Sequence, residues 1–359
     1  MTRATPIIIV LFFGCAADDG TVERGRHVDF VIDSGLTPCG DLVSHMDRFV
    51  ELIAATWEVD LSDHQFTYHW YTETNFNASS GCRMGTQGCA LNGVANSYIA
   101  PHDHELVHLV TAAAGLPPSF FAEGAAVAFE LPAVFIDGAV RLPGDTPIDG
   151  DVLLASALPA DQYLLAGAFT RFLIDRFGVS SYLDFYSNLK PSDDLDLVAE
   201  AHEASFGESF NDTIAHFDAD RRGCDYERFR LKLFECTSPK IAWQGDTATL
   251  RRELSCAEDD VVGPFFLGAQ VSTWASLRIE HSGLYELSAA TDGAGVEIFL
   301  GSCGGCESIH PLTIYSGGGP QRVILDGGDY YVRLDAAVTA EPAVSLRIRR
   351  LGPDEDGTR

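Results

Sequence analysis

Two histidines and a glutamate stand close together at residues 104–108, in the order His-Glu-Leu-Val-His. A helix turns by about 100° per residue, so positions four apart lie on one face and His104 and His108 can bind the same metal ion. Glu105 would then flank the open coordination position, where a carboxylate can accept a proton from metal-bound water. The segment predicts a metal centre with a general base, carried by a helix over residues 102–114.

A third ligand for this centre follows fifteen residues after His108. A glycine and two prolines within residues 115–118 must end the first helix and reverse the chain. Ser119 can cap a second helix over residues 119–129, and the reversal lets Glu123 return to the face that holds both histidines. Two histidines and one glutamate form a ligand set of catalytic zinc, with the fourth position left for water.

The two segments together resemble the gluzincin metallopeptidases, the HExxH…E class that includes thermolysin-like and M1-type enzymes. Residues 120–126, Phe-Phe-Ala-Glu-Gly-Ala-Ala, match the ligand helix of that family, so the resemblance implies Glu123 as the third ligand. It also implies Zn²⁺ as the cofactor, a peptide or protein substrate, and an α+β zincin-like fold. By the same analogy Leu91–Ala100 is the edge strand that pairs with substrate backbone.

A tyrosine at the start of a later helix is the candidate for stabilising the oxyanion. Residues 163–173 resemble a helix of M1-type enzymes in which a tyrosine hydroxyl has this role, and the resemblance implies the same for Tyr163. The alternative is a tyrosine that packs its ring in the core. His202 is a second candidate donor. His102 stands two residues before His104, points away from the metal face and is not expected to be a ligand.

Residues 1–15 have the features of an export signal. A positive start is followed by the apolar run Ile7–Phe13, which is too short to span a bilayer. Residues 11–15 resemble the lipobox of bacterial lipoproteins, in which the cysteine is lipidated and becomes the mature N-terminus. The resemblance implies a membrane anchor at Cys15, a location in the bacterial cell envelope, and a tether over residues 16–26. The alternative is an ordinary signal peptide and a secreted protein.

Nine cysteines make an odd count, which an anchor at Cys15 would reduce to eight. An exported protein lies in an oxidising compartment where disulfides persist. A Cys-x-x-Cys pair within residues 303–306 lacks the second pair of a zinc ribbon, so a tight-loop disulfide is expected there. The expected pairs join cysteines that are near in sequence: Cys82 with Cys89, Cys236 with Cys224 or Cys256, and Cys303 with Cys306.

The hydrophobic pattern divides the chain into two domains: residues 27–237, which the resemblance implies are zincin-like, and an all-β domain over residues 248–351. Short alternating runs separated by glycines are typical of a β-sandwich and are found only in the second. The first is predicted to contain strands at 27–32 and 65–71, a loop at 72–89, a hairpin at 134–142, and helices at 40–57, 163–177 and elsewhere within 159–235.

Parts of the second domain also resemble a known module. Residues 283–288 and 327–334 are similar to strand pairs of bacterial pre-peptidase C-terminal domains, small β-sandwiches appended to secreted peptidases. The resemblance implies a role in targeting, substrate capture or stabilisation.

The net charge is −28, from 52 acidic and 24 basic residues, and it disfavours binding partners that are themselves negatively charged. Such a field repels nucleic acids and anionic lipid head groups, so membrane attachment would have to come from acyl chains. We expect a monomeric zinc peptidase with Glu105 as general base. The alternatives are a non-catalytic binding or adhesion lipoprotein on the same scaffold and an extracellular zinc-binding structural protein.

Overall fold

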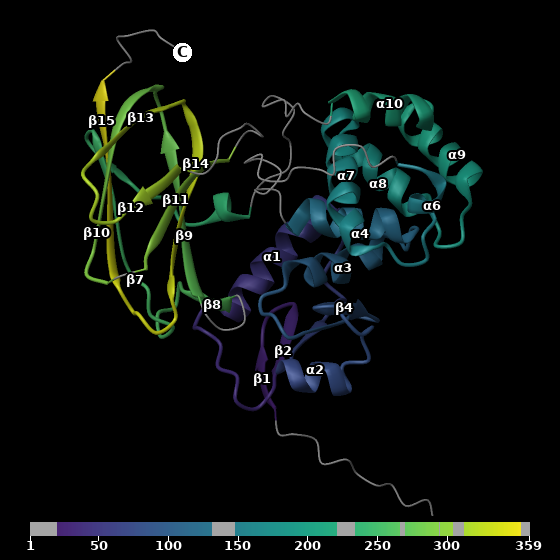
Figure 1. Ribbon diagram of the computed structural model, residues 1–359, viewed down its shortest axis with the longest axis horizontal. Helices are drawn as coiled ribbons and strands as arrows, with labels where there is room; N and C mark the ends of the chain where they lie inside the picture. The colour runs from purple at the N-terminus through teal and green to yellow at the C-terminus, as the bar shows by residue number, and fades with distance from the viewer. Residues whose placement is uncertain are drawn as a thin grey trace, which may run out of the picture.

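The computed structural model describes residues 20–130, 148–220, 234–265, 270–293, 295–303 and 312–352. The export signal with Cys15 and the hairpin predicted at residues 134–142 lie outside this part of the chain. The described residues form an N-terminal α/β domain and a C-terminal β domain, which lie side by side in Figure 1.

A five-stranded mixed sheet in the order β1-β2-β3-β5-β4 begins the fold. Its strands are β1 (Thr21–Arg24), β2 (Val28–Ile32), β3 (Phe66–Trp70), β4 (Gly88–Leu91) and β5 (Val94–Ser97). The three central strands are parallel, and the edge strands β1 and β4 are antiparallel to their neighbours. Alternate residues of β2 and β3 are buried, because successive side chains of a strand point to opposite faces. The strands predicted at 27–32 and 65–71 are confirmed.

The strand predicted at residues 91–100 is wrong in its extent and in its place in the sheet. Asn92 and Gly93 have positive φ angles of 51° and 79° and form a two-residue turn that joins β4 to β5. Strand β5 pairs with β3 on one side and β4 on the other. The edge strand is therefore β4, and the expected edge strand is internal.

Two other segments of this region are more ordered than the sequence indicated. Residues 21–24 form β1, so the tether expected at 16–26 does not extend over them. The loop expected at 72–89 contains a short helix, α2 (Glu73–Ser79), because the Thr72 side chain caps it by accepting a hydrogen bond from the Asn75 N–H.

Helices cover the sheet and continue as a bundle beyond it (Figure 1). The longer helices are α1 (Leu42–Thr56), α3 (Asp103–Ala114), α4 (Ser119–Glu130), α7 (Tyr163–Phe177), α8 (Val179–Asn188), α9 (Leu195–Phe206) and α10 (Phe210–Asp220). The described residues also contain a short helix α6 (Gly150–Leu153) and two 3₁₀ turns (Ala160–Gln162 and Glu235–Thr237). The helices predicted at 40–57, 102–114, 119–129 and 163–177 are confirmed, as is the helical pattern from 159 as far as Asp220.

Helix α4 is anchored in the core by two adjacent phenylalanines. Phe120 and Phe121 are fully buried, and burying one such side chain contributes about 1.5–3 kcal/mol. Ser119 is the first residue of the helix and does not cap it, since its hydroxyl accepts a hydrogen bond from the Leu158 N–H instead. The Pro118 carbonyl accepts the first helical hydrogen bonds.

The C-terminal domain consists of two five-stranded sheets, ordered β13-β10-β15-β7-β6 and β12-β11-β14-β9-β8. Buried residues from both sheets form one apolar core, so the predicted β-sandwich is confirmed. The first sheet contains β6 (Trp243–Gln244), β7 (Thr247–Glu253), β10 (Gly283–Thr291), β13 (Gln321–Leu325) and β15 (Ala343–Gly352). The second contains β8 (Val262–Phe265), β9 (Gln270–Ile279), β11 (Glu297–Ser302), β12 (Leu312–Tyr315) and β14 (Gly328–Ala337).

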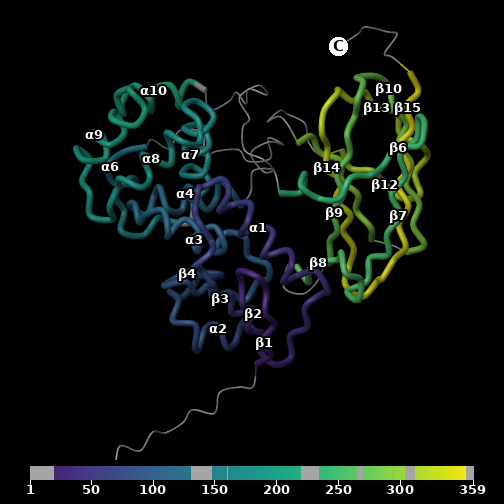
Figure 2. Tube along the Cα trace, turned by 180° about the vertical axis from the view of Figure 1, so that it is seen from behind, coloured from purple at the N-terminus to yellow at the C-terminus, as the bar shows by residue number. Residues whose placement is uncertain are grey.

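Apolar contacts join the two domains along α1. His45 on α1 is buried between the rings of Phe234 and Trp274, with ring centroids 4.8 and 5.4 Å away. Val262 of β8 belongs to the core of the N-terminal domain. Figure 2, seen from behind, shows β8 beside the N-terminal end of α1, where the Cys39 N–H donates to the Gly263 carbonyl. The sandwich is thus packed against the α/β domain.

Three disulfides are formed among the described cysteines, and two of them differ from the expected pairs. Cys82 pairs with Cys89 as predicted. The other two bonds, Cys39–Cys256 and Cys236–Cys303, contradict the pairing of Cys236 with Cys224 or Cys256 and the tight loop at 303–306. Cys39–Cys256 joins the two domains. The disulfides indicate a non-reducing, exported environment, and no helix among the described residues has the length and apolarity to cross a membrane.

We predict that the double substitution Cys39→Ser/Cys256→Ser lowers the thermal unfolding temperature more than Cys82→Ser/Cys89→Ser. The two bonds close sequence separations of 217 and 7 residues. On the chain-entropy model such loops correspond to about 5 and about 2 kcal/mol. Calorimetry of both variants without reductant tests this, and an equal or reversed order would contradict it.

Candidate metal centre

Helix α3 places both histidines of the motif on one face. His104 and His108 are one turn apart, and their ring centroids are 4.8 Å apart. Helix α3 ends at Ala114 with Gly115 as its C-cap, as the sequence predicted. The side of α3 that faces the core buries Leu106, Val107 and Val110, so the imidazoles lie at the edge of an apolar wall.

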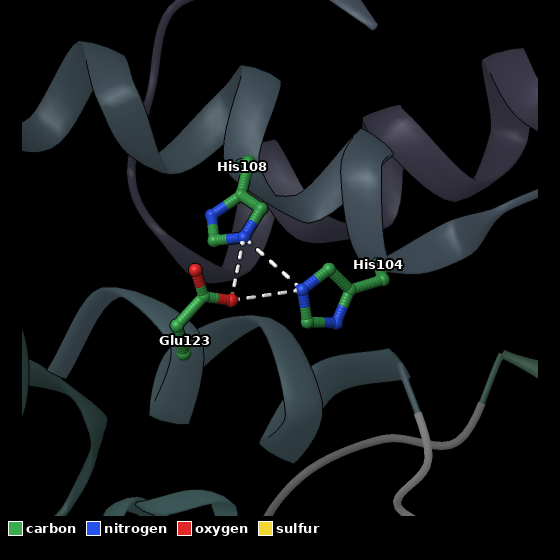
Figure 3. A group of neighbouring side chains, drawn as sticks. All are labelled: His104, His108 and Glu123. Carbon is green, nitrogen blue, oxygen red and sulfur yellow. Dashed lines mark hydrogen bonds and ion pairs between the residues drawn. The ribbon is translucent and has the colours of Figure 1, made fainter. Parts of the chain in front are cut away.

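Helix α4 returns to this face and supplies Glu123. One carboxylate oxygen, Oε2, lies 3.0 Å from Nε2 of His104 and 3.2 Å from Nε2 of His108. The two Nε2 atoms are 3.1 Å apart. Figure 3 shows the two imidazoles projecting from one helix toward the carboxylate on the other. In the part of the chain that the structure describes, this trio is the one group of His, Cys, Asp and Glu with the geometry to hold a metal ion.

A second carboxylate, that of Glu130, contacts the other ring nitrogen of His104 and was not predicted from the sequence. Oε2 of Glu130 lies 3.0 Å from Nδ1 of His104, on the opposite side of the ring from Glu123. A carboxylate on the second nitrogen fixes the tautomer and orientation of a metal-binding imidazole. The signal was present, because Glu130 follows Glu123 by two helical turns and shares its face of α4.

The charges of the cluster stabilise one another. Burial by itself lowers the pKa of the His104 imidazole, but the hydrogen bonds of Glu123 and Glu130 outweigh it and raise the pKa to about 10. Burial likewise opposes the ionisation of Glu123, but its hydrogen bonds to the two histidines hold the pKa of this carboxyl far below its usual range. The hydrogen bonds of the two carboxylates therefore favour the charged form of the His104 imidazole.

Glu105 lies beside the trio and is not part of it. Its side chain is almost fully buried, which raises its pKa, while the nearby His104 and His108 partly offset that effect. Strand β4 approaches it closely at Gly88, where a Cβ atom would lie 2.8 Å from Oε1 of Glu105. Only glycine fits at this position without displacing the carboxylate.

Tyr163, at the start of α7, also reaches the cluster. Its ring stacks on His104, with the two ring centroids 5.8 Å apart. Burial, followed by the negative charges of Glu123 and Glu105, raises its pKa well above the usual value. Helix α7 comes this close because Gly124 of α4 faces it, where a Cβ would lie 2.6 Å from the Thr170 hydroxyl.

His202, the second candidate donor, is a core residue in this structure. It is fully buried on α9 among phenylalanine rings, and its Nδ1 bonds to the Glu208 carbonyl. Burial lowers its pKa to about 4. His102 is not in the metal trio, as expected, but lies close to Glu105.

Comparisons with known proteins leave the family open. The sequence matches no family model, and no curated protein matches it. The pre-peptidase C-terminal domain of a collagenase from Bacillus anthracis is similar over 31% of this chain and 94% of its own, at 12% identity and a TM-score of 0.22. The structure of IMPa from Pseudomonas aeruginosa in complex with an O-glycopeptide is similar over 64% of this chain and 23% of its own, at 13% identity and a TM-score of 0.21. Similarity at this level carries no argument about function.

We predict that Glu130→Ala weakens zinc binding about 10- to 100-fold, because His104 loses the acceptor that orients it. Competition with a chromogenic chelator measures the dissociation constant. Glu130→Gln is the matched control, since it keeps an acceptor oxygen without the charge and should fall between the other two. Unchanged affinity in Glu130→Ala would contradict this role.

Proposed function

We propose that this protein is an exported zinc metallopeptidase of the gluzincin type. The observation that carries the proposal is the convergence of His104, His108 and Glu123 on one point, with the buried carboxylate of Glu105 beside them. Two imidazoles, one carboxylate and an adjacent general base are what metal-assisted peptide hydrolysis requires.

The distances within the trio suit zinc. Zinc bonds of about 2.0–2.2 Å in tetrahedral geometry place two ligand atoms about 3.3 Å apart. The three separations between ligand atoms here are 3.0, 3.1 and 3.2 Å. The ligand atoms therefore need to separate only slightly to hold the ion, and Glu130 already holds His104 in place.

Zinc, when bound, lowers the pKa of a coordinated water and polarises the substrate carbonyl. In the mechanism that we propose, Glu105 accepts the proton of the attacking water and passes it to the leaving amine. Its burial raises its pKa, which makes the carboxylate a stronger base. Tyr163 keeps its phenolic proton, because its pKa is raised, and donates it in a hydrogen bond to the developing oxyanion.

We further propose that the substrate binds as an extended strand along β4. This strand ends the sheet, and β5 is its one strand partner in the described chain, so its outer backbone groups are available for β-augmentation. Gly88 at its start contacts Glu105, which places a paired substrate next to the general base. Met84 in the loop before β4 and Leu91 at its end, 91% and 68% exposed, offer apolar contacts.

Anchoring of the chain through a lipid on Cys15, and a pre-peptidase C-terminal role for the sandwich, remain parts of this proposal. Mass spectrometry of the mature N-terminus from a bacterial membrane fraction tests the anchor.

We predict that Glu105→Ala keeps one zinc ion per chain and loses peptidase activity by at least about a thousandfold, because the general base is removed and the ligands are not. Metal analysis and digestion of a broad peptide library measure the two quantities. His104→Ala is the control that should lose both. Wild-type protein without stoichiometric zinc would overturn the proposal.

Two outcomes would favour the alternative functions. Stoichiometric zinc with no cleavage of any peptide, in wild type and Glu105→Ala alike, would indicate a binding protein. Unfolding by 1,10-phenanthroline would indicate structural zinc, whereas a catalytic ion can be removed with loss of activity and retention of fold.

We predict that Tyr163→Phe lowers kcat about 10²- to 10³-fold and leaves KM nearly unchanged, because the lost hydrogen bond forms only with the oxyanion. Phenylalanine keeps the ring that stacks on His104. Steady-state kinetics on a cleaved library peptide provides the measurement. A rise in KM at constant kcat would instead assign Tyr163 to substrate binding.

A further inference from the structure

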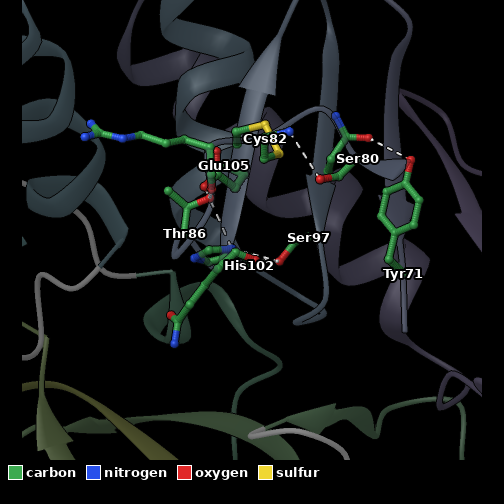
Figure 4. The surroundings of a disulfide bond; sticks show 11 residues. Tyr71, Ser80, Cys82, Thr86, Ser97, His102 and Glu105 are labelled. Carbon is green, nitrogen blue, oxygen red and sulfur yellow. Dashed lines mark hydrogen bonds and ion pairs between the residues drawn. A yellow bond between two sulfur atoms is a disulfide. The ribbon is translucent and has the colours of Figure 1, made fainter. Parts of the chain in front are cut away.

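A third histidine lies next to the general base and belongs to neither the ligand set nor the core. His102 immediately precedes α3, and its side chain is largely buried. Its Nδ1 lies 3.0 Å from the Ser97 hydroxyl and 3.9 Å from Oε1 of Glu105. Figure 4 shows His102 between these two residues.

Hydrogen-bond accounting at Ser97 assigns the tautomer of His102. The Ser97 hydroxyl has one proton, and it donates that proton to the Gln87 carbonyl at 2.9 Å. It accepts from the Ile99 N–H at 3.0 Å. All three contacts are satisfied together when Nδ1–H of His102 donates to the hydroxyl oxygen, whereas a hydroxyl proton on Nδ1 would leave the Gln87 contact unmade. We therefore take the tautomer that satisfies all three. The proton is on Nδ1, the nitrogen that also faces Glu105.

The hairpin of β4 and β5 packs closely against His102 and Glu105. Gly88 of β4 is the cross-strand partner of Ser97 on β5. A Cβ atom at Gly88 would lie 2.7 Å from Nδ1 of His102 and 2.8 Å from Oε1 of Glu105. The strand therefore covers both groups, with no room for a methyl group over them. The Cys82–Cys89 disulfide joins the loop before Gly88 to the residue after it.

We propose that His102 is a positioning residue for Glu105: its Nδ1–H, held by Ser97, faces one oxygen of the carboxylate and limits the orientations that the general base can take. The inference rests on the proposed peptidase function. At 3.9 Å the attraction is electrostatic, and in a buried site such an attraction is screened less than in water. The histidine would act through Glu105 without contacting metal or substrate.

Substitutions at His102 test the proposal. Asparagine can place an N–H near the position of Nδ1, whereas phenylalanine fills the volume without a donor. We expect His102→Phe to lower kcat at least about tenfold with KM within about twofold, and His102→Asn to restore kcat to within about threefold of wild type. Both variants should hold one zinc ion per chain and unfold near the wild-type temperature.

Three outcomes of these substitutions would overturn it: wild-type kcat in His102→Phe, no rescue by asparagine in a folded variant, or loss of zinc, which would make His102 part of the metal site. Nitrogen NMR of ¹⁵N-histidine-labelled protein gives a readout that does not depend on activity. We expect the proton on Nδ1 in wild type and a change of that signal in Ser97→Ala. An Nε2–H tautomer would overturn the proposal even if the protein proved not to be a peptidase. Failure of the peptidase function itself would show separately, as insensitivity of activity to Glu105→Ala.

Discussion

The N-terminal domain is organised around the contact between the Glu123 carboxylate and two imidazoles on a facing helix. Burying a carboxylate without partners costs several kcal/mol, and His104 and His108 remove that cost. The contact requires α4 to reverse onto α3 and to pack closely on α7, which Gly124 permits. The same packing brings Tyr163 to the cluster from a distant part of the chain. The ligand contact and the helix packing therefore depend on each other.

Strong local signals explain why much of this domain was predictable. The spacing of His104 and His108 places them on a common face of any helix. The glycine and prolines at 115–118 end α3 and reverse the chain, so that α4 packs back on that face. Helix α7 ends where Gly178 takes a positive φ of 91°, as its glycine predicted. Glu130 was not predicted because the ligand set is already complete at Glu123, although two further turns of the same helix bring the Glu130 carboxylate to Nδ1 of His104.

Features that depend on contacts between distant segments could not be predicted. Cys39 meets Cys256 across 217 residues because the sandwich packs on α1, and nothing near either cysteine in the sequence indicates this. The approach of Gly88 to Glu105 is of the same kind, since it follows from the register of β4 on β5. The edge strand is a different case. Asn92-Gly93 is a strong hairpin signal, so the strand predicted over 91–100 could have been divided from the sequence alone.

The charge arrangement around His104 suits the site with and without an ion. The hydrogen bonds of Glu123 and Glu130 raise the pKa of His104 to about 10, which favours the charged imidazole between them. In the metallopeptidase that we propose, the ion would need the neutral imidazole, so ion and proton would compete for His104. Glu130 thus has two opposed effects. It orients His104 as a bound ion would require, and it stabilises the proton that such an ion would displace. Because each state satisfies the buried carboxylates, α3 and α4 can stay together in both. The large apolar core beneath them, which includes Phe120 and Phe121, supports the same helix pair without any ion.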